Sequence, residues 1–357
     1  MKKRVGILTS GGDCPGLNAA IRGAAKALYE MFGDEVEIVG ILNGYTGLIN
    51  GDYKEMNKSD FYGILTLGGT ILGTSRQPFK TIQVVGADGV DKVANMIKTY
   101  NNLRLDCLLT LGGNGTHKTA NLLSQKGLNV IGLPKTIDND IFGTDRTFGF
   151  HTAVDIASEV LDRLHTTATS HSRVIVVECM GNKVGWLSLF SGIAGGADVI
   201  LLPELPFSYE KVAKAVLKRK ADGRNFAIVL VAEGALSKEE ETLKRKTRVK
   251  RRGGTNVTPH VTQYIAEHTG IETRSMIPGH YLRGGTPSAY DRVLATEFGA
   301  YAAKLIKEEK YGLTVALKND KVTCNRLEDI AGKAKPVPKD YDLIQYAKSI
   351  GISFCEG

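Results

Sequence analysis

The feature that most constrains the fold of this 357-residue chain is a repeated order of segments. Short apolar runs rich in Val, Ile and Leu are each followed by a glycine-containing turn and a segment of helical period. The order recurs at RVGILT (4–9), DCLLTL (106–111), RVIVVECM (173–180) and FAIVLVAEG (226–234). Apolar strands that alternate with helices indicate parallel sheets covered on both faces. The sequence therefore predicts an α/β fold, in which ligands bind beyond the carboxyl ends of the strands.

Composition narrows the class of protein and the kind of partner. Hydrophobic residues make up 42% of the chain and charged residues 24%, as in ordinary globular enzymes. The five cysteines are widely spread and form no C-x-x-C pair, so neither a zinc site nor a disulfide framework fits. No apolar run is long enough for a signal peptide or a membrane span, and we expect a cytoplasmic protein with no membrane partner. The net charge of +8 favours anionic partners without distinguishing nucleic acid from small phosphorylated ligands.

Two segments stand apart from the repeated order. The amphipathic stretch FGFHTAVDIASEVLDRLHTTATSH (148–171) is predicted to connect two lobes. Residues 236–256 are polar and strongly basic, and they end in Gly253 and Gly254. A solvated loop is the leading interpretation of this basic segment, and contact with nucleic acid or another polyanion is the alternative.

Two glycine-rich turns follow predicted strands and open predicted helices. They are TSGGDCPGLNAAIRG (9–23) and LGGNGTHKTANLL (111–123), and neither matches the dinucleotide fingerprint or the P-loop pattern. Exposed amides at such a turn, together with a helix N-terminus, make an anion site. A third glycine-rich stretch, GGTILGTSR (68–76), adds Arg76, whose guanidinium suits a phosphate. Several such loops on one sheet indicate a polyphosphate cradle.

A third strand end carries carboxylates. The stretch PKTIDNDIFGTD (134–145) places Asp138, Asp140 and Asp145 beside one lysine. Turn chemistry, in which Asp and Asn cap the backbone, explains one or two of these residues but not all three. Next to a polyphosphate, such carboxylates hold a metal ion or accept a proton from an attacking hydroxyl. Lys135 and Thr136 are then placed to contact the phosphoryl group.

A cationic cluster suits a second, smaller phosphate. The stretch ETRSMIPGHYLRGGTPSAYDR (272–292) supplies Arg274, His280 and Arg283 within ten residues, which fits a monophosphate dianion. Arg173 begins one predicted strand and Glu233 ends another. A polyphosphate cradle, a carboxylate base and a monophosphate clamp together indicate phosphoryl transfer.

These motifs, in their order and spacing, resemble those of bacterial 6-phosphofructokinases from residue 4 to about residue 300. The resemblance implies two lobes, each a mainly parallel sheet covered by helices. Residues 1–149 and 282–325 would form the nucleotide lobe, and residues 150–281 and 326–357 the fructose 6-phosphate lobe. It also implies ATP as phosphoryl donor, Mg²⁺, regulation by allosteric effectors and a glycolytic role without nucleic acid.

The resemblance also implies a role for each matching position. Asp138 matches the general base that takes the proton from the sugar's 1-hydroxyl, with Lys135, Thr136 and Asp140 as the other catalytic residues. Asn114 and Asp140 match the metal site. The ATP positions are Gly12, Tyr45, Arg76, Gly113, Asn114, Gly115 and Thr116. The fructose 6-phosphate positions are Thr136, Asp138, Arg173, Met180, Gly181, Asn182, Glu233, Arg274, His280 and Arg283. Arg173 and Arg274 match residues that reach a neighbouring subunit's site, so we expect a homotetramer or homodimer.

The chain departs from the family's usual pattern at several positions. Asn114 replaces a carboxylate that helps to hold Mg²⁺, and Asn182 replaces an arginine. Lys135 stands where the usual motif has glycine, as in pyrophosphate-using members and some ATP-using ones. At the family's effector site Arg22 is kept, whereas Asp52 replaces an arginine and Asp198 is a shorter carboxylate.

The donor is the main open choice. Pyrophosphate-using relatives typically carry an aspartate where this chain has Gly115, and that side chain would exclude the α-phosphate of ATP. We therefore predict ATP, with pyrophosphate as the alternative, which Lys135 favours. A catalytically weak regulatory subunit is a further alternative, favoured only by Asn114 and Asn182.

Overall fold

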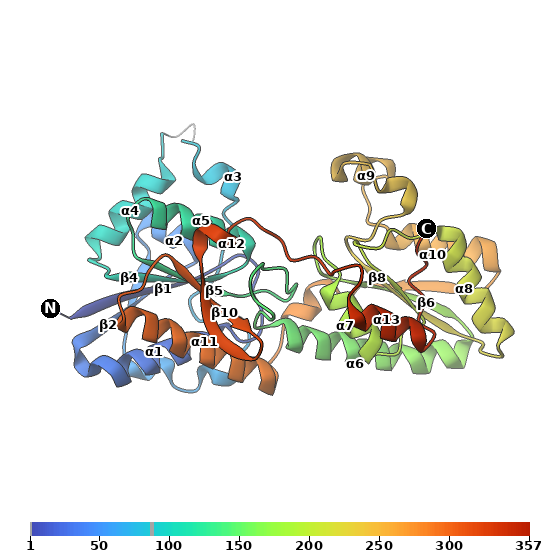
Figure 1. Ribbon diagram of the computed structural model, residues 1–357, viewed down its shortest axis with the longest axis horizontal. Helices are drawn as coiled ribbons and strands as arrows, with labels where there is room; N and C mark the ends of the chain where they lie inside the picture. The colour runs from blue at the N-terminus through green and yellow to red at the C-terminus, as the bar shows by residue number, and fades with distance from the viewer. Residues whose placement is uncertain (1, 86–88) are drawn as a thin grey trace. The chain divides into compact units, whose positions relative to one another are not determined.

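The computed structural model describes residues 2–85 and 89–357, which divide into two compact units. Each unit contains one sheet with helices packed against it (Figure 1). Both sheets are mainly parallel, which confirms the predicted α/β class. The first unit comprises the chain up to Thr152 and Arg283–Lys335, and the second comprises Ala153–Leu282 and Pro336–Gly357.

The sheet of the first unit has seven strands in the order β11-β10-β5-β4-β1-β2-β3. Its five inner strands are parallel, and the edge strands β3 and β11 are antiparallel to their neighbours. The inner strands β1, β4 and β5 are almost wholly buried, as expected for strands covered on both faces. The strands are β1 (Lys3–Ser10), β2 (Val36–Ile41), β3 (Tyr53–Met56), β4 (Cys107–Gly112), β5 (Val130–Pro134), β10 (Leu313–Lys318) and β11 (Lys321–Arg326).

Helices cover both faces of this sheet (Figure 1). On one face α1 packs closely against α11, because Gly23 and Gly299 have no side chain: a Cβ at Gly23 would lie 2.7 Å from the carbonyl oxygen of Thr296. On the other face α2, α4 and α5 pack on a core that includes Leu8, Val39 and Leu108. The helices are α1 (Leu17–Phe32), α2 (Tyr45–Asn50), α3 (Phe79–Ile82), α4 (Lys92–Asn102), α5 (Asn114–Gln125), α11 (Ala289–Lys307) and α12 (Leu327–Ile330). Short 3₁₀ turns lie at Gly33–Glu35, Lys58–Phe61 and Ile64–Thr66, and a further one at Gly279–Arg283 spans the boundary with the second unit.

The second unit has four parallel strands in the order β7-β8-β6-β9. Valines of β6 and β8 pack against α8 and α10 in one buried cluster. The strands are β6 (Val174–Cys179), β7 (Val199–Leu201), β8 (Ala227–Ala232) and β9 (Thr273–Met276). The helices are α6 (Phe150–His171), α7 (Trp186–Ala194), α8 (Tyr209–Ala221), α9 (Arg245–Arg251), α10 (Thr258–Thr269) and α13 (Asp342–Ser349), with a 3₁₀ turn at Lys238–Glu240. Across the described ranges, no helix has the length and apolarity of a membrane span.

The crossings between the units show one difference from the sequence-based boundaries. The chain leaves the first unit within α6, inside the stretch predicted to connect two lobes. Its last crossing follows Lys335, whereas the resemblance placed it near residue 325. In this extension the side chain of Asn114 forms hydrogen bonds with the backbone of Gly332 and Lys333, which belong to the first unit.

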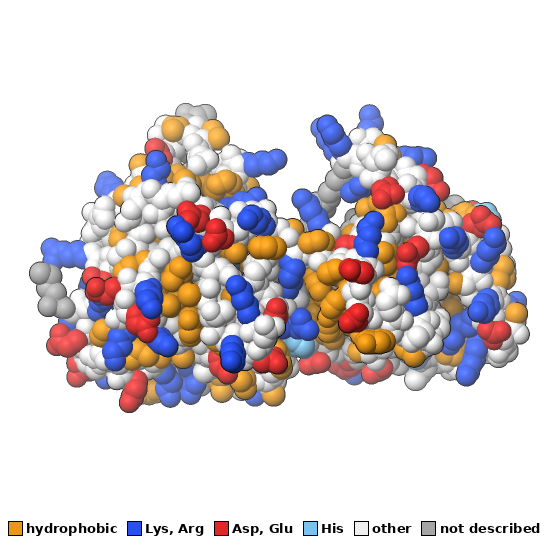
Figure 2. All heavy atoms as spheres, viewed as in Figure 1, with side chains coloured by type: hydrophobic (Ala, Val, Ile, Leu, Met, Phe, Trp, Pro, Cys, Tyr) orange, Lys and Arg blue, Asp and Glu red, His pale blue; other side chains and the backbone are white. Residues whose placement is uncertain are grey.

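The basic segment 236–256 is more ordered than a solvated loop. It contains the helix α9, and Figure 2 shows Lys and Arg side chains gathered over it. At its base Arg252 forms a buried ion pair with Glu240, whose carboxylate also caps the 3₁₀ turn at Ser237. The side chains of Lys246, Lys250 and Arg251 in α9 are exposed. The segment is therefore a short helix anchored by one buried pair, with a solvated outer face.

Candidate active site

Three loops meet at the carboxyl edge of the first unit's sheet. β4 lies between β1 and β5, and the parallel register pairs Ser10 with Gly112 and Gly112 with Pro134. The segments that follow these strand ends therefore lie side by side. We call them the first glycine loop (11–16), the second glycine loop (112–116) and the carboxylate loop (135–148).

The stretch 68–76 covers the first glycine loop. The Gly11 N–H donates to the carbonyl of Ser75 at 3.0 Å, and the Thr74 hydroxyl donates to the carbonyl of Gly11 at 2.7 Å. Gly11 has φ +89°, a conformation that a residue with a side chain rarely adopts. Arg76 follows directly and is exposed.

Two cations bind the carbonyl oxygens of the first glycine loop. Lys135 donates through Nζ to Gly12, and Arg283 donates through a terminal nitrogen to Asp13 at 3.1 Å. A Cβ at Gly12 would lie 2.5 Å from the Arg283 guanidinium, so a side chain there would require Arg283 to move. The resemblance assigned Arg283 to fructose 6-phosphate, and the structure places it against the loop expected to bind ATP.

Lys135 is buried at this loop and Arg283 is partly buried. Lys135 is 3% exposed, and burial lowers its pKa, with the Arg283 charge acting in the same direction. The Nε atom of Arg283 is buried and has no hydrogen-bond partner within the described chain. An anion at this loop would give the Arg283 Nε an acceptor and would stabilise the charge of the buried Lys135.

The second glycine loop has an open outer side and a packed inner side. A Cβ at Gly115 would meet no heavy atom of the described residues within 4 Å. Beneath the loop, the Tyr45 hydroxyl donates to the carbonyl of Thr116 at 3.0 Å, and the Thr116 hydroxyl donates to that of Ser10 at 3.3 Å. Tyr45 is 1% exposed. The resemblance assigned Tyr45 to ATP, and the structure places it under the loop, where it supports the backbone.

Asn114 uses its side chain within the protein. Its Oδ1 accepts the Gly332 N–H at 2.9 Å, and its Nδ2 donates to the carbonyl of Lys333 at 3.0 Å. The amide therefore binds the chain segment that approaches the end of the first unit. The oxygen of Asn114 that was predicted to bind a metal ion already accepts one hydrogen bond, which leaves one lone pair of that oxygen for a cation.

His117 is a residue of this site that the sequence interpretation missed. Its Nδ1 lies 3.0 Å from the carbonyl of Gly113, which can only accept, so Nδ1 carries the proton. Its Nε2 then accepts from the Thr314 hydroxyl at 2.8 Å. Complete burial lowers the pKa of His117 to about 4. The neutral imidazole fixes the start of α5, and its position four residues after Gly113 was the only signal in the sequence.

The carboxylate loop is closed by its own polar side chains. Asn139 has φ +51° and is fully buried; its side chain accepts the Thr147 N–H and donates to the carbonyl of Asp145. The Thr147 hydroxyl donates to the carbonyl of Thr136 at 2.7 Å, and the Thr136 hydroxyl accepts the Asp138 N–H at 3.1 Å. These bonds fix the backbone that presents Asp138.

The three carboxylates of this loop have different environments. Asp145 accepts the Asn319 N–H at 2.7 Å and so stabilises the turn between β10 and β11. Turn chemistry therefore accounts for Asp145. Burial raises the pKa of Asp140, with smaller opposing contributions that include the charges of Lys335 and Lys135. Asp138 is half-buried and shares the loop with both.

Asp140 is the side chain that fits a magnesium ion best. Burial penalises its charged form, and a cation would relieve that penalty. Mg²⁺ commonly binds one or two carboxylates and completes its shell with water and substrate phosphates. Among the described residues no group of three or more His, Cys, Asp or Glu side chains forms a ready-made metal site. The residues present thus fit a metal that arrives with a phosphorylated ligand.

The second unit brings together part of the predicted sugar-phosphate set. Gly181 follows the end of β6 with φ +150°, and a Cβ there would lie 2.6 Å from the carbonyl of Val184. The next residue, Asn182, donates its N–H to the carboxylate of Glu233, which follows β8. Met180, Gly181, Asn182 and Glu233 therefore lie at the carboxyl edge of this sheet.

The predicted arginines lie at the opposite edge of the same sheet. Arg173 directly precedes β6, and Arg274 lies on β9 opposite Ile175. Both form ion pairs with Glu272, at 2.9 and 2.8 Å. The six residues of β6 span about 20 Å, so these arginines do not reach Glu233 within one unit. His280 is exposed on the 3₁₀ turn before Arg283.

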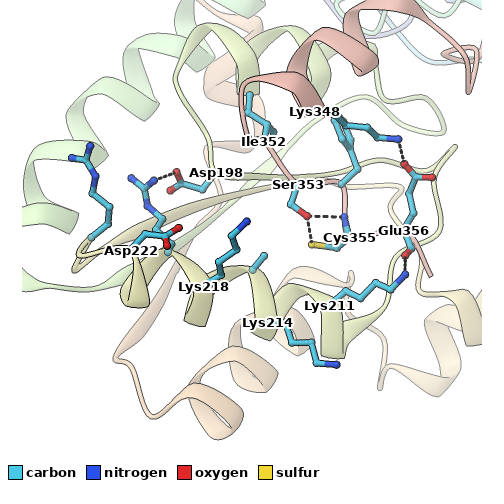
Figure 3. A pocket seen from close by; sticks show the side chains of 15 residues that line it. Asp198, Lys211, Lys214, Lys218, Asp222, Lys348, Ile352, Ser353, Cys355 and Glu356 are labelled. Atoms are coloured by element: carbon cyan, nitrogen blue, oxygen red, sulfur yellow. Dashed lines mark hydrogen bonds and ion pairs between the residues drawn. The ribbon is translucent and has the colours of Figure 1, made fainter.

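A separate cavity of about 770 Å³ lies in the second unit between α8 and the C-terminal segment (Figure 3). Its lining includes Lys214, Lys218, Lys348 and Asp198, and none of the residues predicted for catalysis or substrate binding. Asp198 pairs with Arg219 at 2.7 Å and accepts the backbone N–H of Ile228. The carboxylate that the resemblance matched to the effector site is therefore already paired.

Glycine loops bound by a buried lysine and a partly buried arginine, beside a carboxylate loop on parallel strands, define a phosphotransferase of the α/β class. The phosphofructokinase family model matches residues 4–306. ATP-dependent 6-phosphofructokinase of Spirochaeta thermophila is 54% identical over 99% of this chain and 97% of its own length. The enzyme named ATP-dependent 6-phosphofructokinase 3 of Bacteroides thetaiotaomicron is 44% identical over 98% of this chain and 99% of its own. The chain belongs to the phosphofructokinase family.

Solved structures agree with this assignment. Phosphofructokinase from Pichia pastoris superposes with a TM-score of 0.81 at 31% identity, covering 98% of this chain and 37% of that one. This chain therefore spans well under half of the fungal chain. A pyrophosphate-dependent phosphofructokinase from Nitrosospira multiformis gives a TM-score of 0.82 at 19% identity, covering 98% and 92%. At that identity the similarity shows the fold alone.

Proposed function

We propose that this protein is an ATP-dependent 6-phosphofructokinase, which converts fructose 6-phosphate and ATP to fructose 1,6-bisphosphate and ADP in glycolysis. The observation that carries the proposal is the pair Lys135 and Arg283, both bound to carbonyl oxygens of the first glycine loop. Three residues after Lys135, the same loop presents Asp138. A phosphate site and a proton acceptor thus share one short segment, as phosphoryl transfer to a hydroxyl requires.

Asp138 is the proposed general base. The 1-hydroxyl oxygen of the sugar attacks the γ-phosphorus, the bond from that phosphorus to the β–γ bridging oxygen breaks, and Asp138 takes the hydroxyl proton. Lys135 stabilises negative charge on the transferring group. Thr136 fixes the Asp138 backbone, and Asp140 would hold Mg²⁺, which neutralises donor phosphate charge when bound. These roles are supported by the contacts within the carboxylate loop.

ATP is the proposed donor, because Gly115 leaves free space beside the second glycine loop. The backbone amides of this loop and Arg76 would contact the phosphates. The curated relatives at 54% and 44% identity are named ATP-dependent. Pyrophosphate is the second candidate, and the burial of Lys135 favours it, since a buried ammonium there suits a small anion.

The sugar-phosphate site is proposed to need more than one copy of the chain. Met180, Gly181 and Glu233 would contact the sugar. Arg173 and Arg274 lie at the other edge of the sheet, so we infer that they serve the site of a neighbouring subunit. This arrangement supports a homotetramer or homodimer.

The deciding experiment measures product formation by purified protein with fructose 6-phosphate, Mg²⁺ and either ATP or pyrophosphate. We expect a higher kcat/KM with ATP. A higher value with pyrophosphate would replace the donor and keep the enzyme class. No turnover with either donor, from folded and oligomeric protein, would favour the regulatory-subunit alternative.

A further inference from the structure

One segment of the first unit binds both the second glycine loop and the carboxylate loop. Residues Gly332–Lys335 follow the last helix of the unit and end where the chain crosses to the second unit. We call this segment the strap. Its contacts join parts of the chain that are about 190 to 219 residues apart in sequence.

At the end of the strap next to the second glycine loop, the strap is held by Asn114. Its amide makes two hydrogen bonds to the strap backbone, accepting from Gly332 at 2.9 Å and donating to Lys333 at 3.0 Å. An aspartate has no donor, so it would lose the bond to Lys333 and set an acceptor against a carbonyl. Gly332 has φ +88°, and a Cβ there would lie 2.8 Å from the side chain of Lys118. Both Asn114 and Gly332 thus suit this contact specifically.

At the end of the strap next to the carboxylate loop, the strap is held through Lys335. Its backbone N–H donates to the carbonyl of Asp140 at 2.9 Å, next to an antiparallel bridge between Ile141 and Ala334. Its ammonium donates to the carbonyls of Thr144 and Asp145, at 2.8 and 2.9 Å. Residues 140–145 of the carboxylate loop are therefore bound at several points by this short segment.

We propose that the strap fixes the carboxylate loop relative to the second glycine loop, with Asn114 and Lys335 as its positioning residues. The proposal rests on the function proposed above, in which these loops hold the proton acceptor and the donor phosphates. Phosphoryl transfer depends on placement of the reacting groups, so a loop displaced by an ångström slows the reaction while leaving binding largely intact. Neither residue contacts the reacting atoms; each acts through the backbone it holds.

Kinetics of Lys335 variants test this role. In Lys335→Met we expect kcat to fall about tenfold, with KM for fructose 6-phosphate nearly unchanged, because the carboxylate loop loses the two hydrogen bonds from the lysine side chain. Lys335→Arg keeps a cationic donor and should recover most of kcat. Lys333→Met is the matched control: it removes a charge from the same strap and keeps the carbonyl bond to Asn114. It gives up only a weak contact of the ammonium group with the Phe142 ring, 5.6 Å from the ring centroid. An equal loss of kcat in Lys333→Met would overturn the proposal.

A double-mutant cycle tests whether both ends act through one element. If the strap couples the loops, releasing either end removes the coupling, so Asn114→Ala with Lys335→Met should cost less in kcat than the two single losses combined. Fully additive losses would show that the two residues act independently and would refute the coupling.

Hydrogen exchange provides a measurement that needs no catalysis. Amides of the carboxylate loop should exchange about tenfold faster in Lys335→Met and in Asn114→Asp than in the wild type. Unchanged exchange in both folded variants would contradict the strap. Where Lys335→Met does not fold, Lys335→Arg and Asn114→Asp supply the comparison. Inactive wild-type protein would refute the proposed function, and the exchange data would still decide whether the strap fixes the loop.

Discussion

The ammonium group of Lys135 donates a hydrogen bond to the carbonyl oxygen of Gly12, so the end of β5 is joined to the loop that follows β1. Lys135 is almost fully buried, and burial lowers its pKa. Burying an ammonium group costs free energy unless an anion lies close to it, so the position of Lys135 favours binding of a negatively charged group. A phosphoryl group carries that charge.

The first prediction concerns Lys135. In Lys135→Met the charge disappears while the stem remains, and we expect kcat/KM for ATP to fall roughly a hundredfold, the loss typical of one electrostatic donor at a reacting centre. Thermal stability should not fall, because the variant no longer buries a charge. Steady-state kinetics and a melting curve check both statements. A large loss of stability with unchanged kcat/KM would show that the lysine is structural.

The second prediction concerns the base. Asp138→Asn keeps the shape of the side chain and removes the proton acceptor. Turnover should fall at least about a hundredfold, with KM for fructose 6-phosphate little changed. Asp145→Asn is the matched control, because Asp145 caps a turn and an amide oxygen still accepts the Asn319 N–H. Near-wild-type turnover in Asp138→Asn would remove Asp138 from this role.

The third prediction concerns the arginines paired with Glu272. Arg274→Ala should raise KM for fructose 6-phosphate about tenfold or more, the cost of charge-assisted hydrogen bonds to a phosphate, and change kcat less. Arg163→Ala is the control: Arg163 is an exposed arginine of the same unit, paired with Glu159.

The same variant tests whether the arginine serves a neighbouring subunit. Mixed oligomers of Arg274→Ala and Asp138→Asn should regain activity, because some sites would combine an intact Asp138 from one subunit with an intact Arg274 from its neighbour. Mixed oligomers that stay inactive would mean that each site is built from one chain.

The fourth prediction is a pH dependence of stability. Burial lowers the pKa of His117 to about 4 in the folded protein, below its ordinary value of 6.5. Between these two pH values the unfolded chain binds more protons at His117 than the folded protein does. The contribution of His117 to the free energy of unfolding is therefore fully present above about pH 6.5 and is lost as the pH drops towards 4. The loss amounts to about 3 kcal/mol. Melting temperatures from pH 4 to 8 should decline less steeply in His117→Asn, and equal slopes would contradict the assignment.

The sequence predicted the parts of the site that depend on local order along the chain. Asp138 follows an apolar strand, Gly12 and Gly115 lie in turns that open helices, and parallel strands bring such loops to one edge. These relationships follow from periodicity and turn residues alone. The α/β class was predicted for the same reason, and the structure and the family assignment confirm it.

The remaining features depend on contacts that no local pattern encodes. Asn114 binds a segment about 220 residues further along the chain, so its side chain could not be assigned from the GGNG motif. Tyr45 lies under the second glycine loop because α2 packs against the core there. Asp145 caps a turn between two strands that come late in the sequence. In each case a distant partner decides the role of the residue.

The last prediction concerns the donor and depends on Gly115. A Cβ at this position would meet no heavy atom of the described residues within 4 Å, and its φ lies outside the range that excludes side chains. Gly115→Asp should therefore fold normally, and its carboxylate would project into the space proposed for the α-phosphate of ATP. Like charges at close range repel, whereas pyrophosphate has no α-phosphate to be repelled. We expect kcat/KM for ATP to fall about a hundredfold or more, with any pyrophosphate activity reduced less. Gly115→Ala adds volume without charge and is the matched control, for which a much smaller loss is expected. Side-by-side assays with both donors measure the ratio, and an Asp variant that keeps its preference for ATP would show that the nucleotide follows another path.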